Sequence, residues 1–91
     1  MRRASKVDAN QPEIVAALRR AGAIVTPMHQ AGRGIADLAV SYRQRWLWIE
    51  VKSDDGELNR LQKAWIGSQR APVYVVKSPA EAIEILNTVT P

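Results

Sequence analysis

The stretch that decides the fold spans residues 36 to 52 and reads ADLAVSYRQRWLWIEVK. Apolar residues alternate with other residues on both sides of a polar centre, which is the period-two pattern of two β-strands joined by a tight turn. The pattern predicts a hairpin with strands over 36–41 and 46–52, joined around Tyr42–Arg45.

The side chains of this hairpin also select its register. If residues 43 and 44 form the centre of the turn, Leu38 faces Ile49 and Val40 faces Leu47, so that one face of the hairpin is uniformly apolar, with Ala36 and Val51 as its next pair. A slip of one residue would place apolar side chains opposite polar ones. We therefore expect this face to be buried.

The same register places Asp37 opposite Glu50 on the other face, with Lys52 two residues further along the strand. Like charges opposite each other destabilise a sheet by up to about 1 kcal/mol, and the neighbouring tryptophans lower the local dielectric constant and raise that cost. Either Lys52 neutralises a carboxylate at a solvated strand end, or a divalent cation compensates both acids. Mg²⁺ and Mn²⁺ favour carboxylate oxygens together with water and phosphate oxygens.

Three helices are predicted from the spacing of apolar residues and from their start signals. The first runs over 10–21 and begins with Asn10 as its cap and Glu13 in the capping-box position. The second runs over 58–68. The third begins at residue 78, where Ser78 and Glu81 form a second capping box.

Two further strands complete the predicted sheet. Residues 23–28 form one of them, and Pro27 favours a place at the sheet edge. Residues 73–76 form the other, and their continuous apolar run is typical of a strand covered on both faces. Because a helix connects this strand to the one at 46–52, the two should lie parallel. The predicted fold class is an α/β sandwich with a central mixed four-stranded sheet flanked by helices.

The composition limits the possible functions. The chain has 91 residues, a net charge of +4 and no Cys, so we expect one domain over 10–91 and exclude a disulfide framework, a zinc–thiolate site and a thiol nucleophile. No apolar run approaches the ~18 residues of a membrane span, and we expect a cytoplasmic protein of a bacterial or phage-infected cell. Residues 1–9 form a basic arm, with Arg2, Arg3 and Lys6, that either frays or contacts phosphate.

The residues GIAD at 34–37, WIEVKS at 48–53 and Gln62 on the following helix resemble the VRR-NUC branch of the PD-(D/E)XK nuclease superfamily. The resemblance extends from about Glu13 to about Val76 and includes the element order αβββαβ, the core of this restriction-endonuclease-like fold. Ala36 departs from the pattern, because the superfamily name implies Pro before the Asp. The residue at this position is not a ligand, so the departure leaves the site intact.

The resemblance implies a phosphodiesterase that depends on Mg²⁺ or Mn²⁺. Asp37 and Glu50 would hold the cation, together with the carbonyl oxygen of Val51. Lys52 would orient the attacking water or help to deprotonate it, and would offset negative charge on the phosphate.

Two further residues have both an implied catalytic role and an ordinary helical one. Glu13 matches the family's helical acid, which contacts the metal directly or through water, and Gln62 matches a Gln that orients the lysine or the water. Glu13 also has capping-box spacing from Asn10, and Gln62 has it from Asn59. The two roles are compatible, and both stay open at this point.

Basic and aromatic residues suggest how DNA would be held. Trp46 and Trp48 share the face of the two acids, where we expect packing against the first helix, with stacking on bases as the alternative. Basic residues in loops or at helix starts suit contacts with backbone phosphates, which give affinity without reading sequence. These residues are Arg33, Arg43, Arg45, Arg60 and Lys63.

The sequence thus predicts a metal-dependent endonuclease that hydrolyses DNA. The resemblance to stand-alone family members implies a homodimer that acts on branched DNA such as four-way junctions, and a two-fold dimer is a reasonable reader of DNA shape. The alternatives are a nuclease subunit of a larger repair, restriction or phage-replication assembly, a non-catalytic DNA-binding module, and an enzyme that cleaves RNA.

Overall fold

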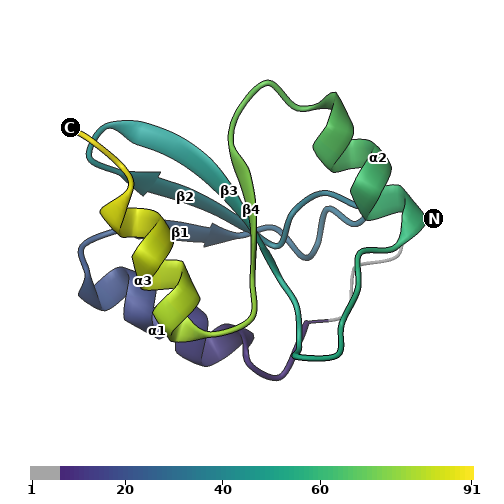
Figure 1. The fold of residues 1–91 in the computed structure, drawn as a ribbon, viewed down its shortest axis with the longest axis horizontal. Helices are drawn as coiled ribbons and strands as arrows, with labels where there is room; N and C mark the ends of the chain where they lie inside the picture. Colours follow the sequence, from purple (N-terminus) through teal and green to yellow (C-terminus); the bar gives the residue numbers. More distant parts are fainter. Residues whose placement is uncertain (1–6) are drawn as a thin grey trace.

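The chain forms an α/β fold in which a four-stranded mixed sheet carries three helices (Figure 1). The computed structural model describes residues 7–91, so Arg2, Arg3 and Lys6 of the expected N-terminal arm lie outside the described residues. The predicted order of elements is confirmed. In chain order they are α1 (Gln11–Arg20), β1 (Ile24–Pro27), β2 (Leu38–Tyr42), β3 (Arg45–Val51), α2 (Arg60–Ser68), β4 (Val73–Val76) and α3 (Pro79–Asn87).

The strands follow the order β1-β2-β3-β4 across the sheet, so β1 and β4 are its edges. The first three strands are antiparallel and β4 runs parallel to β3, as predicted. The predicted hairpin register is also confirmed, with Leu38 opposite Ile49. Arg43 and Gln44 have φ angles of 51° and 64°, the left-handed conformation that two-residue hairpin turns require.

The β2–β3 ladder ends before the two acids. Strand β2 begins at Leu38, so the expected cross-strand pair of Asp37 and Glu50 is not part of the ladder. The backbone carbonyl of Asp37 accepts from the amide of Met28 at 2.7 Å, and its side chain accepts from the amide of Val51 at 2.8 Å. The carboxylate therefore accepts from an amide of β3 in place of a backbone carbonyl of the neighbouring strand, a substitution that short polar side chains can make.

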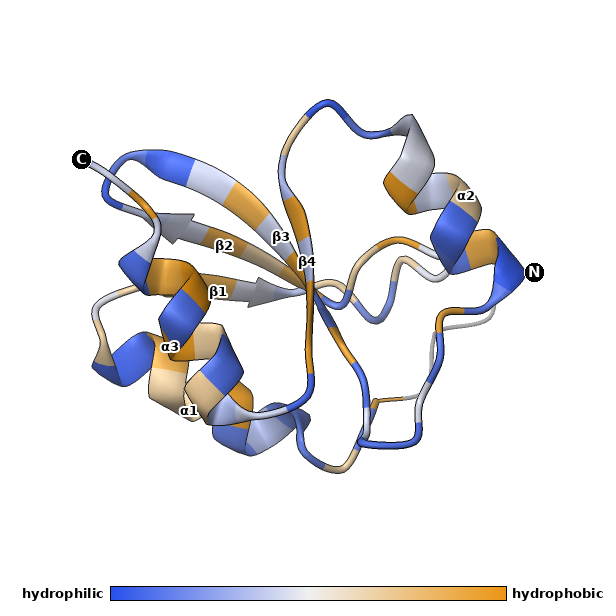
Figure 2. Ribbon diagram, in the orientation of Figure 1, coloured by the Kyte–Doolittle hydropathy of each residue, from blue (hydrophilic) through white to orange (hydrophobic). Residues whose placement is uncertain are grey.

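One face of the sheet forms the hydrophobic core. Leu38, Val40, Ile49 and Val76 are buried there against apolar side chains of α1 and α3, such as Leu18. In Figure 1, α1 and α3 lie together on one side of the sheet and α2 lies on the other. In Figure 2 the strands and α3 carry hydrophobic bands between hydrophilic ones, as expected for elements buried on one side. None of the described helices is long and apolar enough to cross a membrane.

Two of the three helix starts differ from the prediction. Asn10 precedes α1 but makes no side-chain cap, because its Nδ2 donates to the carbonyls of Lys52 and Lys77 at 3.1 and 2.9 Å. The predicted capping box with Glu13 is therefore wrong. At α3, Ser78 caps the helix, but its predicted box partner accepts from the amide of Lys77 instead of that of Ser78.

The face of the sheet opposite the core is only partly covered. Val75 is 41% exposed, so the prediction that β4 is covered on both faces is wrong. Trp46 is 64% exposed, and the expected packing of this residue against α1 is wrong as well, because α1 lies on the other face. Trp48 is half-buried and meets Trp65 of α2 edge to face, with ring centroids 5.1 Å apart. We call this side of the sheet the open face.

Candidate active site

Four of the predicted site residues meet at one end of the open face. Asp37, Glu50, Lys52 and Gln62 line a common pocket of about 310 Å³, and the rest of its lining comes from Asp8, Ile35 and Asn59. The four residues come from the end of the loop before β2, from β3 and the position after it, and from the first turn of α2. Residues up to 25 positions apart in the chain are thus brought together by the β2–β3 hairpin and the helix that follows it.

The two carboxyl groups are deeply buried. Asp37 is 5% exposed and Glu50 is 1% exposed, and they belong to the few buried polar residues of the described chain. Asp37 is anchored through Oδ2 by the amide of Val51. Buried carboxylates are costly unless they are paired or bind a cation, so this arrangement needs a compensating charge.

Burial raises the pKa of both carboxyl groups. For Glu50 the pKa is raised to about 8, first by loss of hydration and then by the nearby charge of Asp37, while Lys52 acts in the opposite direction. Burial also raises the pKa of Asp37, although the hydrogen bond from Val51 opposes that rise. Loss of hydration explains both directions, and the charge of Asp37 adds to the rise at Glu50. A cation bound between the groups would reverse the effect.

Lys52 and Gln62 both contact Glu50. The ammonium Nζ of Lys52 lies 3.6 Å from Oε2 of Glu50, and Nε2 of Gln62 donates to the same oxygen at 2.9 Å. Oε1 of Gln62 accepts from the amide of Asn59, which completes the capping box of α2. Gln62 therefore serves as helix cap and as site residue at once, and its contact in the pocket is the carboxylate of Glu50.

The loop before β2 fits closely against α2. Gly34 has φ +79°, and a Cβ atom at this position would lie 2.4 Å from the carbonyl oxygen of Leu61. Only glycine tolerates both this backbone conformation and this approach. Gly34 thereby lets the loop that carries Asp37 lie against the helix that carries Gln62.

The donor set of the pocket fits a hard divalent cation. Among residues 7–91 no three or more His, Cys, Asp or Glu side chains converge as a preformed metal cage. Mg²⁺ does not require such a cage, because it is commonly bound by one or two carboxylates with waters and substrate phosphates as the other ligands. Asp37 and Glu50 supply two carboxylates against the single positive charge of Lys52, which leaves the three groups with an excess negative charge when both acids are ionised.

Glu13 is not brought into this pocket. It is exposed on α1 and lines a separate groove with Asp54 and Lys77. Asp8 lines the pocket instead, and its charge contributes to the raised pKa of Asp37. The sequence does not single out Asp8, because no motif or spacing distinguishes it from other surface acids. Its position in the pocket depends on how the segment before α1 crosses the end of the sheet.

The remaining predicted residues fall into two groups. Val51 belongs to the site through its amide, and the role of its carbonyl as a metal ligand stays a prediction. Arg33 lies exposed in the loop before β2, and Arg60 and Lys63 lie exposed on α2. The two arginines of the hairpin turn lie at the other end of β3, where Arg43 donates to the carbonyl of Val89 at 3.2 Å and Arg45 to that of Thr90 at 3.5 Å.

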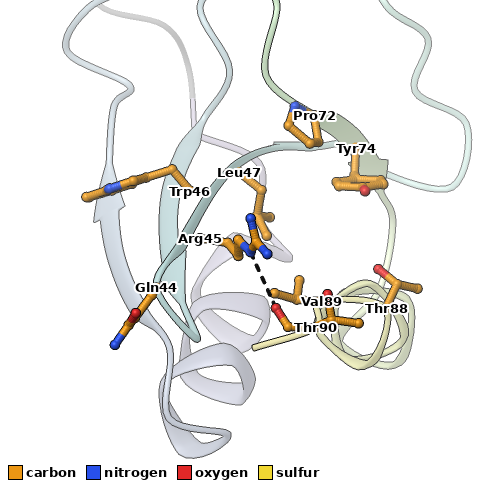
Figure 3. Close-up of a pocket in the computed structure, with 9 residues that line it drawn as sticks. All are labelled: Gln44, Arg45, Trp46, Leu47, Pro72, Tyr74, Thr88, Val89 and Thr90. Atoms are coloured by element: carbon orange, nitrogen blue, oxygen red, sulfur yellow. Dashed lines mark hydrogen bonds between the residues drawn. The ribbon is translucent and has the colours of Figure 1, made fainter.

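A cavity larger than the pocket of the site lies apart from the carboxyl groups. It measures about 470 Å³ and is formed where the start of β3 meets Tyr74 and the segment after α3. Figure 3 shows Arg45 directed toward Thr90 and across this cavity, while the ring of Trp46 points away from it. The cavity contains none of the acids of the site, so volume alone does not identify the chemically active place.

Comparisons with family models, with curated proteins and with solved structures find no match to the chain.

Proposed function

We propose that this protein is a divalent-metal-dependent nuclease of the VRR-NUC type within the PD-(D/E)XK superfamily, with a restriction-endonuclease-like fold and DNA as its substrate. The observation that carries the proposal is the buried pair Asp37 and Glu50 with Lys52 beside it. This is the acid–acid–lysine set that the sequence resemblance implies, and it lies at the end of a sheet face that a large polyanion can approach.

Mg²⁺ or Mn²⁺ would be held by Asp37 and Glu50, with the Val51 carbonyl as a further ligand. When bound, such an ion supplies a more acidic water and a Lewis acid toward the phosphate. The amide of Val51 fixes the carboxylate of Asp37, and Gln62 fixes that of Glu50. Both acids are thus held in place before an ion arrives.

Lys52 supplies the positive group of the reaction. Its Nζ lies 3.6 Å from Oε2 of Glu50 and its side chain is 14% exposed. The ammonium group therefore reaches the pocket while it remains shielded from bulk water. From this position its ammonium orients the attacking water and stabilises the negative charge that builds on the phosphate oxygens. Arg33, Arg60 and Lys63 would contact the DNA backbone around the pocket.

The substrate preference and the assembly state extend this proposal. A homodimer that acts on branched DNA such as four-way junctions is the form that the family resemblance suggests. The main alternative is a nuclease subunit or a non-catalytic DNA-binding module within a larger assembly. An intact acid–acid–lysine set favours the catalytic form, because a binding module has no need to bury two carboxyl groups side by side.

The test is cleavage of linear, nicked, flapped and four-way DNA and of a matched RNA, with Mg²⁺, with Mn²⁺ and with a chelator. We expect metal-dependent cleavage that Lys52→Ala and Glu50→Gln each lower by about 100-fold or more. Glu57→Gln is the matched control, since it removes an exposed carboxylate three residues before α2 and should leave the rate unchanged.

Cleavage that persists in chelator or in Lys52→Ala would contradict the mechanism. Equal rates on linear and four-way DNA would contradict the preference for branched substrates. DNA binding without cleavage by the isolated chain, followed by cleavage on addition of a partner protein, would favour the subunit alternative.

A further inference from the structure

Trp46 is an aromatic side chain that the proposed chemistry does not use. It is 64% exposed, although a tryptophan in a small protein is usually largely buried. Figure 3 shows its ring directed away from the cavity beside Leu47, and therefore away from the α1–α3 side of the sheet. An indole held in water on a rigid strand offers a flat surface for a ligand.

Trp46 lies in line with the site. Trp46, Trp48 and Glu50 occupy alternate positions of β3 and so share the open face. Glu50 lies four positions beyond Trp46, a distance of about 13 Å along β3. The residues opposite the two tryptophans on β2 are small, Ser41 and Ala39, so that no large side chain of β2 covers the indoles.

Between the turn and the site the hairpin carries positive charge. Arg43 and Arg45 are its charged residues over 38–49, and both are exposed. Their guanidinium groups reach carbonyls of Val89 and Thr90 on the α3 side of the sheet, so they attract a polyanion to this end of the sheet and do not line the open face beside Trp46. A strand of nucleic acid that lies on the open face and runs from this end of the sheet toward Glu50 would meet the indole of Trp46 first and the carboxylate pair at the far end of β3. An exposed aromatic ring near a cationic end of the sheet is a combination by which proteins bind single-stranded nucleic acid.

We propose that the open face binds an unpaired stretch of DNA, with a base stacked on Trp46 and the scissile phosphate at Asp37 and Glu50. The inference rests on the proposed function, because it names the substrate class of the same site. Base faces inside a duplex are covered by their neighbours, so an indole stacks on a base only where the strand is unpaired or extruded. At about 3.4 Å per stacked nucleotide, the stacked base lies up to about four nucleotides from the cleaved bond.

The open face is poorly suited to a protein partner at this point. Ile24, the other highly exposed apolar residue of the row, is 67% exposed and is separated from Trp46 by Ser41. Protein interfaces bury a continuous apolar centre, and the polar residue interrupts one here. We therefore do not favour a second copy of the chain as the occupant of this face, and the experiment includes a measurement that distinguishes it from DNA.

The experiment measures binding without cleavage. Lys52→Ala protein in chelator is titrated into labelled oligothymidine and into a labelled duplex of equal length, and anisotropy gives the two dissociation constants. Adding Trp46→Ala should weaken single-strand binding about tenfold and leave duplex binding unchanged, and Trp46→Phe should retain most of the affinity. Ile24→Ala is the matched control, because it removes an equally exposed side chain from the same face without removing an aromatic ring.

Intrinsic fluorescence provides a direct second measurement. Oligothymidine should quench tryptophan emission in the parent protein, and the quench should be largely lost in Trp46→Phe, which keeps Trp48 and Trp65. Equal effects of Trp46→Ala on single strand and duplex, or no effect on either, would overturn the inference. A dimer that becomes a monomer on Trp46→Ala, as measured by light scattering, would instead assign the face to a second copy.

The two proposals fail separately. Single-strand binding that depends on Trp46, without cleavage under any metal, would leave the stacking surface in place and remove the nuclease. Metal-dependent cleavage with no dependence on Trp46 would do the reverse.

Discussion

The two faces of the sheet are covered to very different extents. On the core face, Leu38 and Ile49 are fully buried beneath α1 and α3. On the open face only α2 approaches the sheet, none of its residues is fully buried, and Trp46 stays in water. The same strands build both faces, since alternate side chains point to opposite sides. The core face can therefore carry the stability of this small domain, which leaves the open face free to hold buried charge and an exposed indole.

The largest expected effect is the loss of stability on substitution in the core face. Ile49→Ala removes a fully buried side chain and should lower the free energy of unfolding by about 2–5 kcal/mol, the usual cost of such a cavity. Ile24→Ala on the open face, where the side chain is 67% exposed, should change it by less than about 0.5 kcal/mol. Urea titrations followed by tryptophan fluorescence measure both values.

The milder variant Ile49→Val keeps this comparison measurable if Ile49→Ala does not fold, with an expected loss of about 0.5–1.5 kcal/mol. Similar losses for Ile24→Ala and Ile49→Ala would mean that the open face is covered in solution, and would contradict the division of roles between the two faces.

The next effect concerns the buried acids of the open face. Glu50 has a pKa of about 8 in the folded protein against 4.5 as its ordinary value. Between these pH values the folded state binds more protons than the unfolded state, so the free energy of unfolding falls as pH rises. The stability that this group contributes is fully present below about pH 4.5 and is lost as pH rises through about 8. Asp37 acts in the same direction.

We therefore expect the Tm of the metal-free protein to fall by at least about 10 °C between about pH 5 and about pH 9, given about 1.4 kcal/mol per pKa unit and about 4–8 °C per kcal/mol for a domain of this size. Mg²⁺ should restore more of the Tm at high pH than at low pH, because it binds the ionised carboxylates. Glu50→Gln should flatten the pH profile, whereas the exposed control Glu57→Gln should keep it. A Tm that rises over this range, with no response to Mg²⁺, would contradict the buried acid pair as a cation site.

Much of this fold could be predicted because the decisive contacts are local. Alternation over 36–52 selects one hairpin register by itself, and that register brings Leu38 opposite Ile49. The α/β class and the parallel β3–β4 pair follow from the order of elements. The grouping of Asp37, Glu50 and Lys52 was within reach for the same reason, since the hairpin places all three residues, whereas Gln62 was predicted from the family resemblance alone.

What could not be predicted depends on contacts between distant segments. Asn10 has the sequence context of a helix cap, yet its side chain is taken by carbonyls 42 and 67 residues away. Asp8 enters the pocket and Glu13 does not, because the course of the segment before α1 is set by those same contacts. Trp46 was expected to pack against the first helix, but the alternation of side chains along β3 does not decide which face of the sheet α1 covers.

The smallest expected effect tests how firmly α2 is held to the open face. Gly34→Ala combines a strained backbone, φ +79°, with a Cβ atom 2.4 Å from the carbonyl oxygen of Leu61, and should cost about 1–3 kcal/mol. Gly67→Ala is the matched control, since it lies within α2 and a Cβ there meets nothing within 4 Å. Alanine at this position should stabilise the helix by up to about 1 kcal/mol.

Because Gly34 holds the loop against the helix that carries Gln62, the Gly34→Ala substitution should also lower the affinity for Mg²⁺. The Tm shift with added Mg²⁺ measures this affinity, and Gly67→Ala should leave that shift unchanged. Equal Mg²⁺ responses in the two variants would mean that the position of α2 does not control Glu50, and that the open face holds its acids without help from the helix.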